Sequence, residues 1–180
     1  MEDYQKLALA SYDSKNRYVP GYSILSEFSG PDRTVFQNHK SKKVVISYRG
    51  TNPGNWRDVS TDLLMAGNLY SHRFTKSDQV TKNIISKFGK HNVSLTGHSL
   101  GGSQALYFSN KYKVHSEAYN PYIHPSNWFG VGKGSSYEHA VIHHNYTDPI
   151  STGALFVGAK TRDYRFAGLF AHGIKKPFGS

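Results

Sequence analysis

The sequence predicts an α/β fold in which a mostly parallel central sheet has helices on both faces. Three observations favour this class: apolar strand-like runs alternate with helical stripes, a polar hairpin loop lies near the start, and a strand enters a helix through a glycine-flanked serine, Ser99. Strands that alternate with helices are typical of parallel sheets. A chain of 180 residues is long enough to bury a core without metal or disulfide cross-links, so we expect one domain over residues 1–180.

The first half of the chain supplies a helix, a hairpin and a second helix. Residues 2–12 have a helical apolar stripe, and this helix should cover one face of the sheet. Strand-like runs at 34–37 and 43–48 are joined by a polar loop, and the Val-Val-Ile of the second run is apolar enough for a central strand. Residues 77–88 carry a further helical stripe, with the first residue as a candidate N-cap and Gly89 as a stop.

The second half continues the alternation of strands and helices. We expect a strand from Val93 to the serine turn, a helix over 100–112, and strands over 114–119 and 140–145. A loop containing Pro and Gly separates the last two strands. Residues 153–180 are rich in glycine and aromatic residues without a clear period, so no element is predicted there.

Ser99 is the candidate nucleophile. At a tight turn from a strand into a helix, a serine is held in a strained conformation with its hydroxyl exposed beside the first helical N–H groups. Gly97 and Gly101 fit this interpretation, because side chains at these positions would clash where strand and helix cross. An ordinary Gly-Ser turn is the alternative, but it does not explain the strand before Ser99 and the helix after it.

A serine nucleophile requires a base and a carboxylate that orients the base. In a sheet with such a turn, the order along the chain is nucleophile, acid, histidine. Asp148 directly follows a predicted strand, and His172 is the one histidine beyond it. Asp163 is the second choice for the acid, since it also precedes His172. A turn carboxylate at Asp148 and a surface-loop histidine at His172 are the alternatives.

The remaining histidines do not suggest a metal site. His98 is adjacent to the nucleophile, but neighbouring side chains diverge at a sharp turn, so we expect a structural role for it. His143 and His144 would face opposite sides of a strand and cannot form a pair of ligands. The absence of cysteine excludes disulfides, thiolate ligands and a cysteine nucleophile. We therefore expect neither a metal nor a cofactor.

The net charge of +10, from 22 basic and 12 acidic residues, favours an anionic partner such as a membrane or lipid surface, with a solvated basic face as the alternative. The basic residues are dispersed and no nucleic-acid-binding motif is present, so nucleic acid is disfavoured as a partner.

No apolar run approaches the roughly 20 residues that span a bilayer. The first ten residues lack the apolar stretch of a signal peptide. We expect a soluble chain, either cytoplasmic or exported without a signal of its own.

Several motifs occur in one order: Tyr48-Arg49-Gly50-Thr51, Asn55-Trp56 with Asp62-Leu63, the serine turn at 97–102, and Asp148-Pro149. With these motifs the chain resembles the class 3 lipases of the α/β-hydrolase fold, as a short member without cysteine. The resemblance covers most of the chain and implies a three-layer α/β-hydrolase sandwich. It further implies Ser99 as nucleophile, Asp148 as acid and, by order along the chain, His172 as base.

The resemblance also implies an oxyanion hole formed by Thr51 and the backbone N–H of Leu100. The segment after Thr51 takes the position of the family's lid, although this chain is shorter than the better-known fungal lipases. Its apolar residues either line an acyl groove or insert into lipid, or they belong to the core. These candidate groove residues are Trp56, Leu63, Leu64 and Met65.

The expected function is hydrolysis of lipid acyl esters by a Ser-Asp-His triad through an acyl-enzyme. Triacylglycerol lipase and phospholipase A1 activities are equally compatible with the sequence. The alternative is a protein of the same fold that binds lipid or an anionic partner without catalysis.

Overall fold

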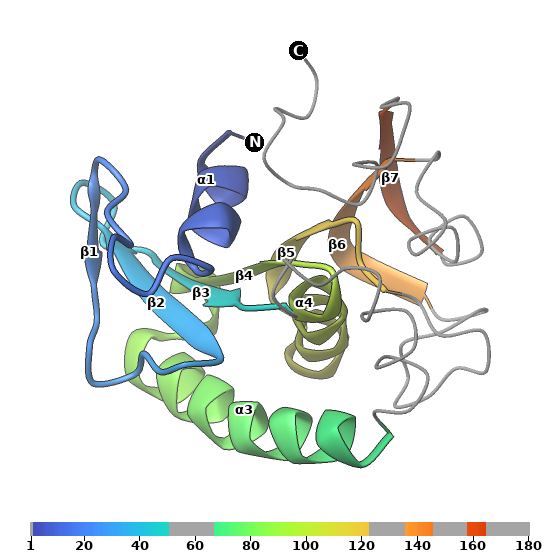
Figure 1. Cartoon of the computed structure of the whole chain (residues 1–180), viewed down its shortest axis with the longest axis horizontal. Coiled ribbons are helices and arrows are strands. Elements are labelled where there is room, and N and C mark those ends of the chain that lie inside the picture. The colour runs from blue at the N-terminus through green and yellow to red at the C-terminus, as the bar shows by residue number, and fades with distance from the viewer. Residues whose placement is uncertain (1, 51–66, 123–135, 146–157, 165–180) are drawn as a thin grey trace.

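A computed structural model gives the arrangement of the chain (Figure 1). It describes residues 2–50, 67–122, 136–145 and 158–164. In this part of the chain, a seven-stranded sheet has its strands in the order that they have in the sequence. The first two pairs of strands are antiparallel, and all later pairs are parallel. The predicted α/β class with a mostly parallel sheet is therefore confirmed.

Helices cover both faces of this sheet. The strands are β1 (Tyr22–Ile24), β2 (Arg33–Asn38), β3 (Val44–Tyr48), β4 (Val93–His98), β5 (His115–Tyr119), β6 (Ser136–Asn145) and β7 (Gly158–Tyr164). The helices are α1 (Glu2–Ala10), α3 (Gly67–Phe88), α4 (Leu100–Tyr112) and the short 3-10 helix η2 (Lys90–Asn92). Helix α1 lies on one face of the sheet, and α3 and α4 lie on the other (Figure 1). Among the described helices, none is long and apolar enough to cross a membrane.

Most predicted elements are found close to their expected bounds. The helix α4 begins and ends at the predicted residues, and α1 packs against β3 and β4 as expected. The predicted hairpin is the antiparallel pair of β2 and β3. Strand β3 lies in the interior of the sheet and is buried along its whole length.

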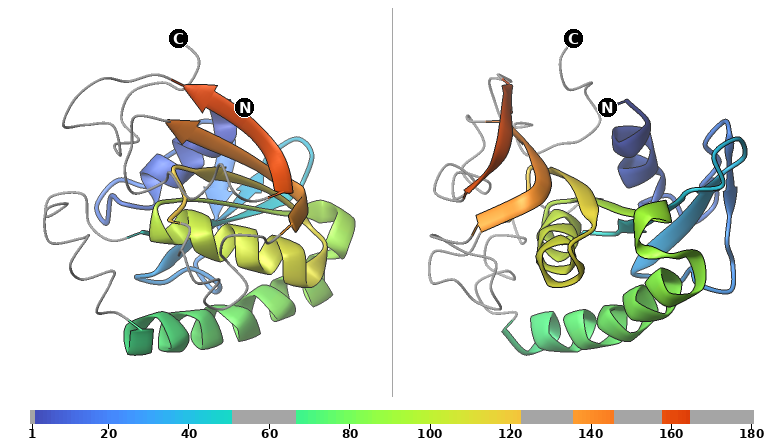
Figure 2. Two further views of the ribbon diagram at one scale, coloured as in Figure 1. Left: turned by 90° about the vertical axis from the view of Figure 1, so that its right-hand side faces the viewer. Right: turned by 180° about the vertical axis from the view of Figure 1, so that it is seen from behind.

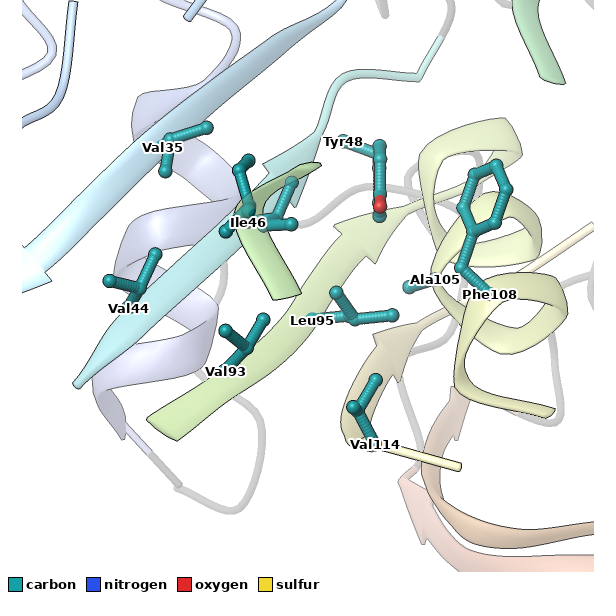
Figure 3. Packing of buried hydrophobic residues seen from close by; sticks show 10 residues of the cluster. Val35, Val44, Ile46, Tyr48, Val93, Leu95, Ala105, Phe108 and Val114 are labelled. Carbon is teal, nitrogen blue, oxygen red and sulfur yellow. The ribbon is translucent and has the colours of Figure 1, made fainter. Parts of the chain in front are cut away.

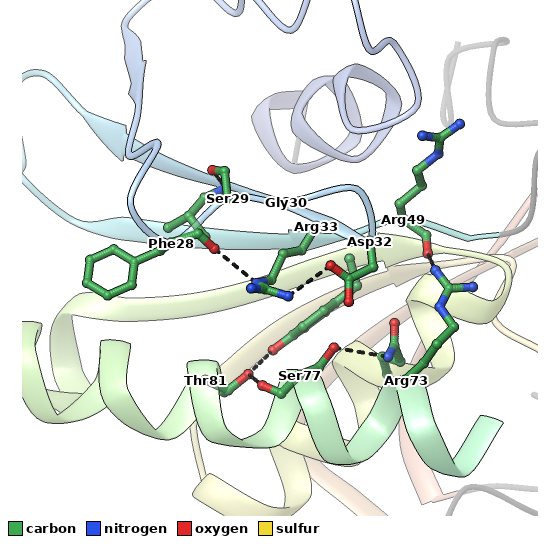
Figure 4. Close-up of polar contacts among 12 residues, drawn as sticks. Phe28, Ser29, Gly30, Asp32, Arg33, Arg49, Arg73, Ser77 and Thr81 are labelled. Carbon is green, nitrogen blue, oxygen red and sulfur yellow. Dashed lines mark hydrogen bonds and ion pairs between the residues drawn. The ribbon is translucent and has the colours of Figure 1, made fainter. Parts of the chain in front are cut away.

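The start of α3 was predicted wrongly. The helix begins at Gly67 rather than at Ser77, and Ser77 is a buried residue within it. The Thr81 hydroxyl donates to the Ser77 carbonyl oxygen over 2.7 Å, as Figure 4 shows. Before Ser77 the sequence is largely polar around the buried Phe74, so the apolar period gave no signal for this part of the helix. The predicted end at Phe88 is confirmed, and Gly89 has a φ of 83°.

Two strands at the edges of the sheet were not predicted. Strand β1 has only 3 residues and no buried position. Strand β7 has the sequence Gly-Ala-Lys-Thr-Arg-Asp-Tyr. This sequence is mostly polar and lacks the alternation of apolar and polar residues that predicts a strand. Figure 2 shows β6 and β7 side by side at one edge of the sheet, with α4 beside β6. Edge strands are often polar or short, which limits pairing with other chains.

Alternating side chains of β3 divide the core between the two faces of the sheet. Val44, Ile46 and Tyr48 belong to the larger cluster, which packs against α3 and α4 (Figure 3). Val45 belongs to a smaller cluster with Leu7 of α1. Burial of each such apolar side chain contributes about 1.5–3 kcal/mol. Packing on both faces therefore fixes β3 and β4 firmly, and the carboxyl ends of these strands form a rigid base for a site.

Candidate active site

Ser99 lies at the turn between β4 and α4. Its backbone has φ 55° and ψ −123°, a conformation that residues other than glycine rarely adopt. The strained turn that the sequence predicts is therefore confirmed. Ser99 is only 2% exposed, however, so the prediction of an exposed hydroxyl is wrong for this structure. Neighbouring segments of the described chain pack closely around the turn.

Three glycines allow this close packing. A Cβ on Gly97 would contact the carbonyl group of Gly101 and lie 2.8 Å from the nitrogen of Gly102. A Cβ on Gly101 would contact the carbonyl oxygen of Tyr48 and lie 2.7 Å from its carbonyl carbon. These contacts confirm the steric requirement predicted for Gly97 and Gly101. Gly50 has the same role, because a Cβ there would lie 2.5 Å from the carbonyl oxygen of His98.

The end of β3 lies directly beside the candidate nucleophile. A Cβ on Gly50 would be 3.3 Å from the Cβ of Ser99. The preceding residue, Arg49, is held through both backbone groups: its N–H donates to the Asp32 carbonyl oxygen over 2.9 Å, and its carbonyl oxygen accepts from Arg73 Nη2 over 2.7 Å (Figure 4). The chain therefore leaves β3 beside Ser99 along a fixed path.

The segment 119–122, at the end of β5, contacts the turn from another side. The Ser99 N–H donates to the Tyr119 carbonyl oxygen over 3.1 Å, and the Tyr122 N–H donates to the Ser99 carbonyl oxygen over 3.2 Å. The hydroxyl of Ser103 donates to the carbonyl oxygen of Tyr122. Sequence reasoning missed this segment, although its Asn-Pro dipeptide is a turn signal.

His98 has the structural role that the sequence predicts. It is 2% exposed, and its Nδ1 lies 2.9 Å from the hydroxyl oxygen of Tyr12. The same hydroxyl is 3.3 Å from the His98 carbonyl oxygen. Burial raises the pKa of Tyr12, so its hydroxyl stays protonated at neutral pH. Tyr12 thus connects the end of α1 to the residue before Ser99.

A second histidine, His143, is paired with a carboxylate in the sheet. Its Nε2 lies 2.7 Å from Glu117 Oε2, and its ring stacks on Tyr119 with 4.4 Å between ring centroids. Burial raises the pKa of Glu117, but the nearby His115 and the hydrogen bond to His143 outweigh burial and bring this pKa to about 2. Glu117 is therefore ionised at neutral pH. His143 is completely buried within β6, and its bond to Glu117 lies in the interior of the sheet.

Only part of the predicted site falls on the described residues. Ser99 and Leu100 are described, and Leu100 is the first residue of α4. Strand β6 ends at Asn145, just before Asp148, and Asp163 lies within β7 in register with His144. The other predicted site residues lie outside the described residues: Thr51, Trp56, Leu63, Leu64, Met65, Asp148 and His172. Among the described side chains, no group of three or more His, Cys, Asp or Glu could hold a metal ion.

Comparison with known proteins supports the fold. No protein-family model and no curated protein sequence matches the chain. A lipase from Rhizopus microsporus var. chinensis is similar in structure, with a TM-score of 0.52 and 18% identity over 84% of this chain and 69% of that chain. Lipase II from Rhizopus niveus has a TM-score of 0.49 and 18% identity, over 84% of this chain and 76% of that chain. The likeness to the first of these lipases shows a fold of the α/β-hydrolase type.

Proposed function

We propose that this protein is a serine carboxylic ester hydrolase that acts on lipid acyl esters. One observation carries the proposal: Ser99 has a strained backbone at the start of α4, and the end of β3 lies beside it. A serine at such a turn presents its hydroxyl to a carbonyl carbon near the N–H groups of the helix. The similarity of the fold to lipases supports the same class of reaction.

In the proposed mechanism, Ser99 attacks the ester carbonyl and His172 takes its proton. Asp148 orients His172 and stabilises its charged form. The alcohol leaves with a proton from His172, and water then releases the fatty acid from the acyl-enzyme. The position of Asp148 just after the end of β6 supports its assignment, since β6 belongs to the same parallel sheet as β4.

The oxyanion of the tetrahedral intermediate requires hydrogen-bond donors. Leu100 is suited to this role because the first N–H groups of a helix have no acceptor within it. Thr51 is the second proposed donor, and its assignment is supported by the position of Gly50 beside Ser99. Each such donor stabilises the transition state by about 3–4 kcal/mol.

The substrate we propose is a lipid ester, either a triacylglycerol or a phospholipid cleaved by phospholipase A1 chemistry. The proposed acyl-binding residues follow Thr51 in the sequence. They are Trp56, Leu63, Leu64 and Met65. The net charge of +10 favours an anionic lipid surface as the partner. Fatty-acid release from triacylglycerol, monoacylglycerol, and anionic or zwitterionic phospholipid vesicles would identify the substrate class.

The experiment that tests the proposal is covalent labelling with a fluorophosphonate. We expect one adduct, mapped to Ser99 by peptide mass spectrometry, and its loss together with ester hydrolysis in Ser99→Ala. Ser86→Ala, an exposed serine on α3, is the matched control and should label like the parent. Labelling that persists in Ser99→Ala, or a parent protein that neither labels nor hydrolyses esters, would refute the proposal.

The two remaining triad members have their own test. His172→Ala should reduce turnover by about 10³-fold or more while the fold is retained. Asp148→Asn should be similarly impaired, whereas Asp163→Asn should remain active. The reverse result for the two aspartates would transfer the acid role to Asp163, and full activity of His172→Ala would exclude His172 as the base.

The low exposure of Ser99 argues against catalysis, and lipid binding without catalysis is the second function that we propose. Under this alternative the protein would bind anionic vesicles equally well before and after Ser99→Ala, and neither form would react with the fluorophosphonate. Vesicle flotation run beside the labelling experiment separates the two functions.

A further inference from the structure

Asn120 directly follows β5 and has a conformation that most residues avoid. Its φ is 41°, in the left-handed region, and it is completely buried. Asparagine tolerates this region better than other residues with a side chain. The positive φ turns the chain sharply between Tyr119 and Pro121, so the chain folds back over the start of α4 instead of continuing the strand.

Two hydrogen bonds hold Asn120 to the end of β6. Its backbone N–H donates to the carbonyl oxygen of His143 over 2.7 Å. Its side-chain Oδ1 accepts from the N–H of Asn145 over 2.8 Å. His143 and Asn145 are both fully buried, so these bonds lie in a dry environment, where hydrogen bonds are strong. Asn120 is thereby fixed in position as well as in conformation.

The residues on either side of Asn120 hold the backbone of Ser99. Tyr119 accepts the Ser99 N–H, and Tyr122 donates to the Ser99 carbonyl oxygen. Pro121 packs on the first turn of α4, since a Cβ on Gly102 would lie 3.1 Å from the Cβ of Pro121. Both backbone groups of the strained residue are therefore bonded to one short segment, and the path of this segment depends on Asn120.

We propose that Asn120 is a positioning residue for the nucleophile. Asn120 acts through segment 119–122, which is bonded to the backbone of Ser99. A strained backbone conformation such as that of Ser99 is kept only where the surrounding contacts hold it in place. The effect of Asn120 on the reaction rests on the proposed ester hydrolysis, whereas its effect on the geometry of the turn does not. Asn120 also binds the end of β6 at Asn145, three positions before Asp148, so segment 119–122 is bonded both to Ser99 and to the end of β6.

Two substitutions separate the contributions of the Asn120 side chain. Asn120→Gly retains the freedom to adopt positive φ but removes the Oδ1 acceptor. Asn120→Ala removes the acceptor and also disfavours positive φ. Ser109→Ala is the control, because the Ser109 hydroxyl makes a buried bond of 2.7 Å to the Val114 carbonyl oxygen at the far end of α4. It removes a buried hydrogen bond without touching the turn.

The first measurement is amide hydrogen exchange at Ser99, Tyr122 and Asn145. The change in the free energy of unfolding of Asn120→Gly predicts a certain increase in the exchange rate of these amides. We expect their measured rates to be about 10-fold higher than that prediction, and higher still in Asn120→Ala. Ser109→Ala should change these amides only as much as its global stability requires. The proposal would be overturned if the exchange rates of these amides in both Asn120 variants were no higher than in Ser109→Ala, once the rates are compared at equal free energy of unfolding.

The second measurement is the rate of reaction with the fluorophosphonate and the hydrolysis of a short-chain ester. Small displacements of a nucleophile reduce rates by up to about 10²-fold. We expect a reduction of this order in kcat for Asn120→Ala, a smaller one for Asn120→Gly, and an unchanged KM for both. Unchanged kcat in both variants would overturn the catalytic part. If the parent protein itself does not react at Ser99, the proposed function fails, and the exchange measurement still decides whether Asn120 positions the turn.

Discussion

Arg73 Nη2, on α3, donates a hydrogen bond of 2.7 Å to the carbonyl oxygen of Arg49, at the end of β3. The next residue, Gly50, lies beside Ser99, so this bond connects a helix on the face of the sheet to the edge of the candidate site. The Arg49 N–H is bonded in turn to the carbonyl oxygen of Asp32. The backbone of Arg49, at the end of β3, is therefore held by two contacts that are distant in sequence.

Removal of the Arg73 guanidinium should impair catalysis as well as stability. In Arg73→Ala the Arg49 carbonyl loses a charged donor, a loss worth about 1.5–3 kcal/mol. The proposed donor Thr51 would then be held less firmly, and we expect kcat for a short-chain ester to fall by about 10-fold. Lys76→Ala, an exposed cation on the same helix, is the control and should keep the parent kcat. Equal kcat values for the two variants would show that Arg73 does not support the site.

Gly101 should tolerate no side chain. A Cβ at this position would overlap the carbonyl group of Tyr48, and both groups belong to backbone that is packed in the core. Gly101→Ala should therefore reduce the free energy of unfolding by about 3 kcal/mol or more, measured by urea denaturation. Gly30→Ala is the control, because its Cβ would meet its nearest neighbour, Asp32 Oδ1, at an ordinary 3.4 Å. A Gly101→Ala protein as stable as Gly30→Ala would contradict the close approach of β3 and α4.

The Tyr12 hydroxyl should stabilise the fold through His98. Tyr12→Phe removes the hydroxyl that lies 2.9 Å from His98 Nδ1. Because His98 is buried, its Nδ1 cannot replace this hydrogen bond with one to bulk water. We expect a loss of about 1–3 kcal/mol in the free energy of unfolding. Tyr18→Phe is the matched control, since Tyr18 is 73% exposed and should show almost no change. Similar stability of both variants would mean that the Tyr12–His98 bond contributes nothing.

The sequence predicts the parts of the fold whose signal is local. The buried strand β3 and the helix α4 each bury a set of side chains with the period of their own element, and both were predicted well. Gly97 and Gly101 were predicted as well, because the steric demand of a strand-to-helix turn acts within a few residues. The start of α3 and the strand β7 were missed, since polar residues there carry no apolar period.

The supports of the site were not predictable because they depend on tertiary contacts. Arg73 and Arg49 are separated by 24 positions, and nothing in the local sequence of either residue indicates the other. The same is true of Tyr12 and His98, which are 86 positions apart. Asn120 carried a turn signal in the sequence, but its bond to the Asn145 N–H depends on the pairing of β5 with β6.

Protonation of Glu117 should destabilise the protein in acid. Its pKa is lowered from the ordinary value of 4.5 to about 2, so the folded state favours the carboxylate more than the unfolded state does. The resulting stabilisation is present above about pH 4.5 and is lost as the pH falls toward 2. The shift corresponds to a limit of roughly 3 kcal/mol. Urea denaturation of the parent between pH 7 and pH 2.5 should show this decrease.

Glu117→Gln isolates the contribution of this carboxylate from that of other acids. The amide keeps an oxygen that can accept from His143 but carries no charge, so the variant should be less stable than the parent at pH 7 and approach it at low pH. Glu138→Gln, at an exposed position on β6, should follow the parent across the whole range. A constant difference between Glu117→Gln and the parent at every pH would mean that the pair of Glu117 and His143 is held by shape and neutral hydrogen bonding rather than by charge.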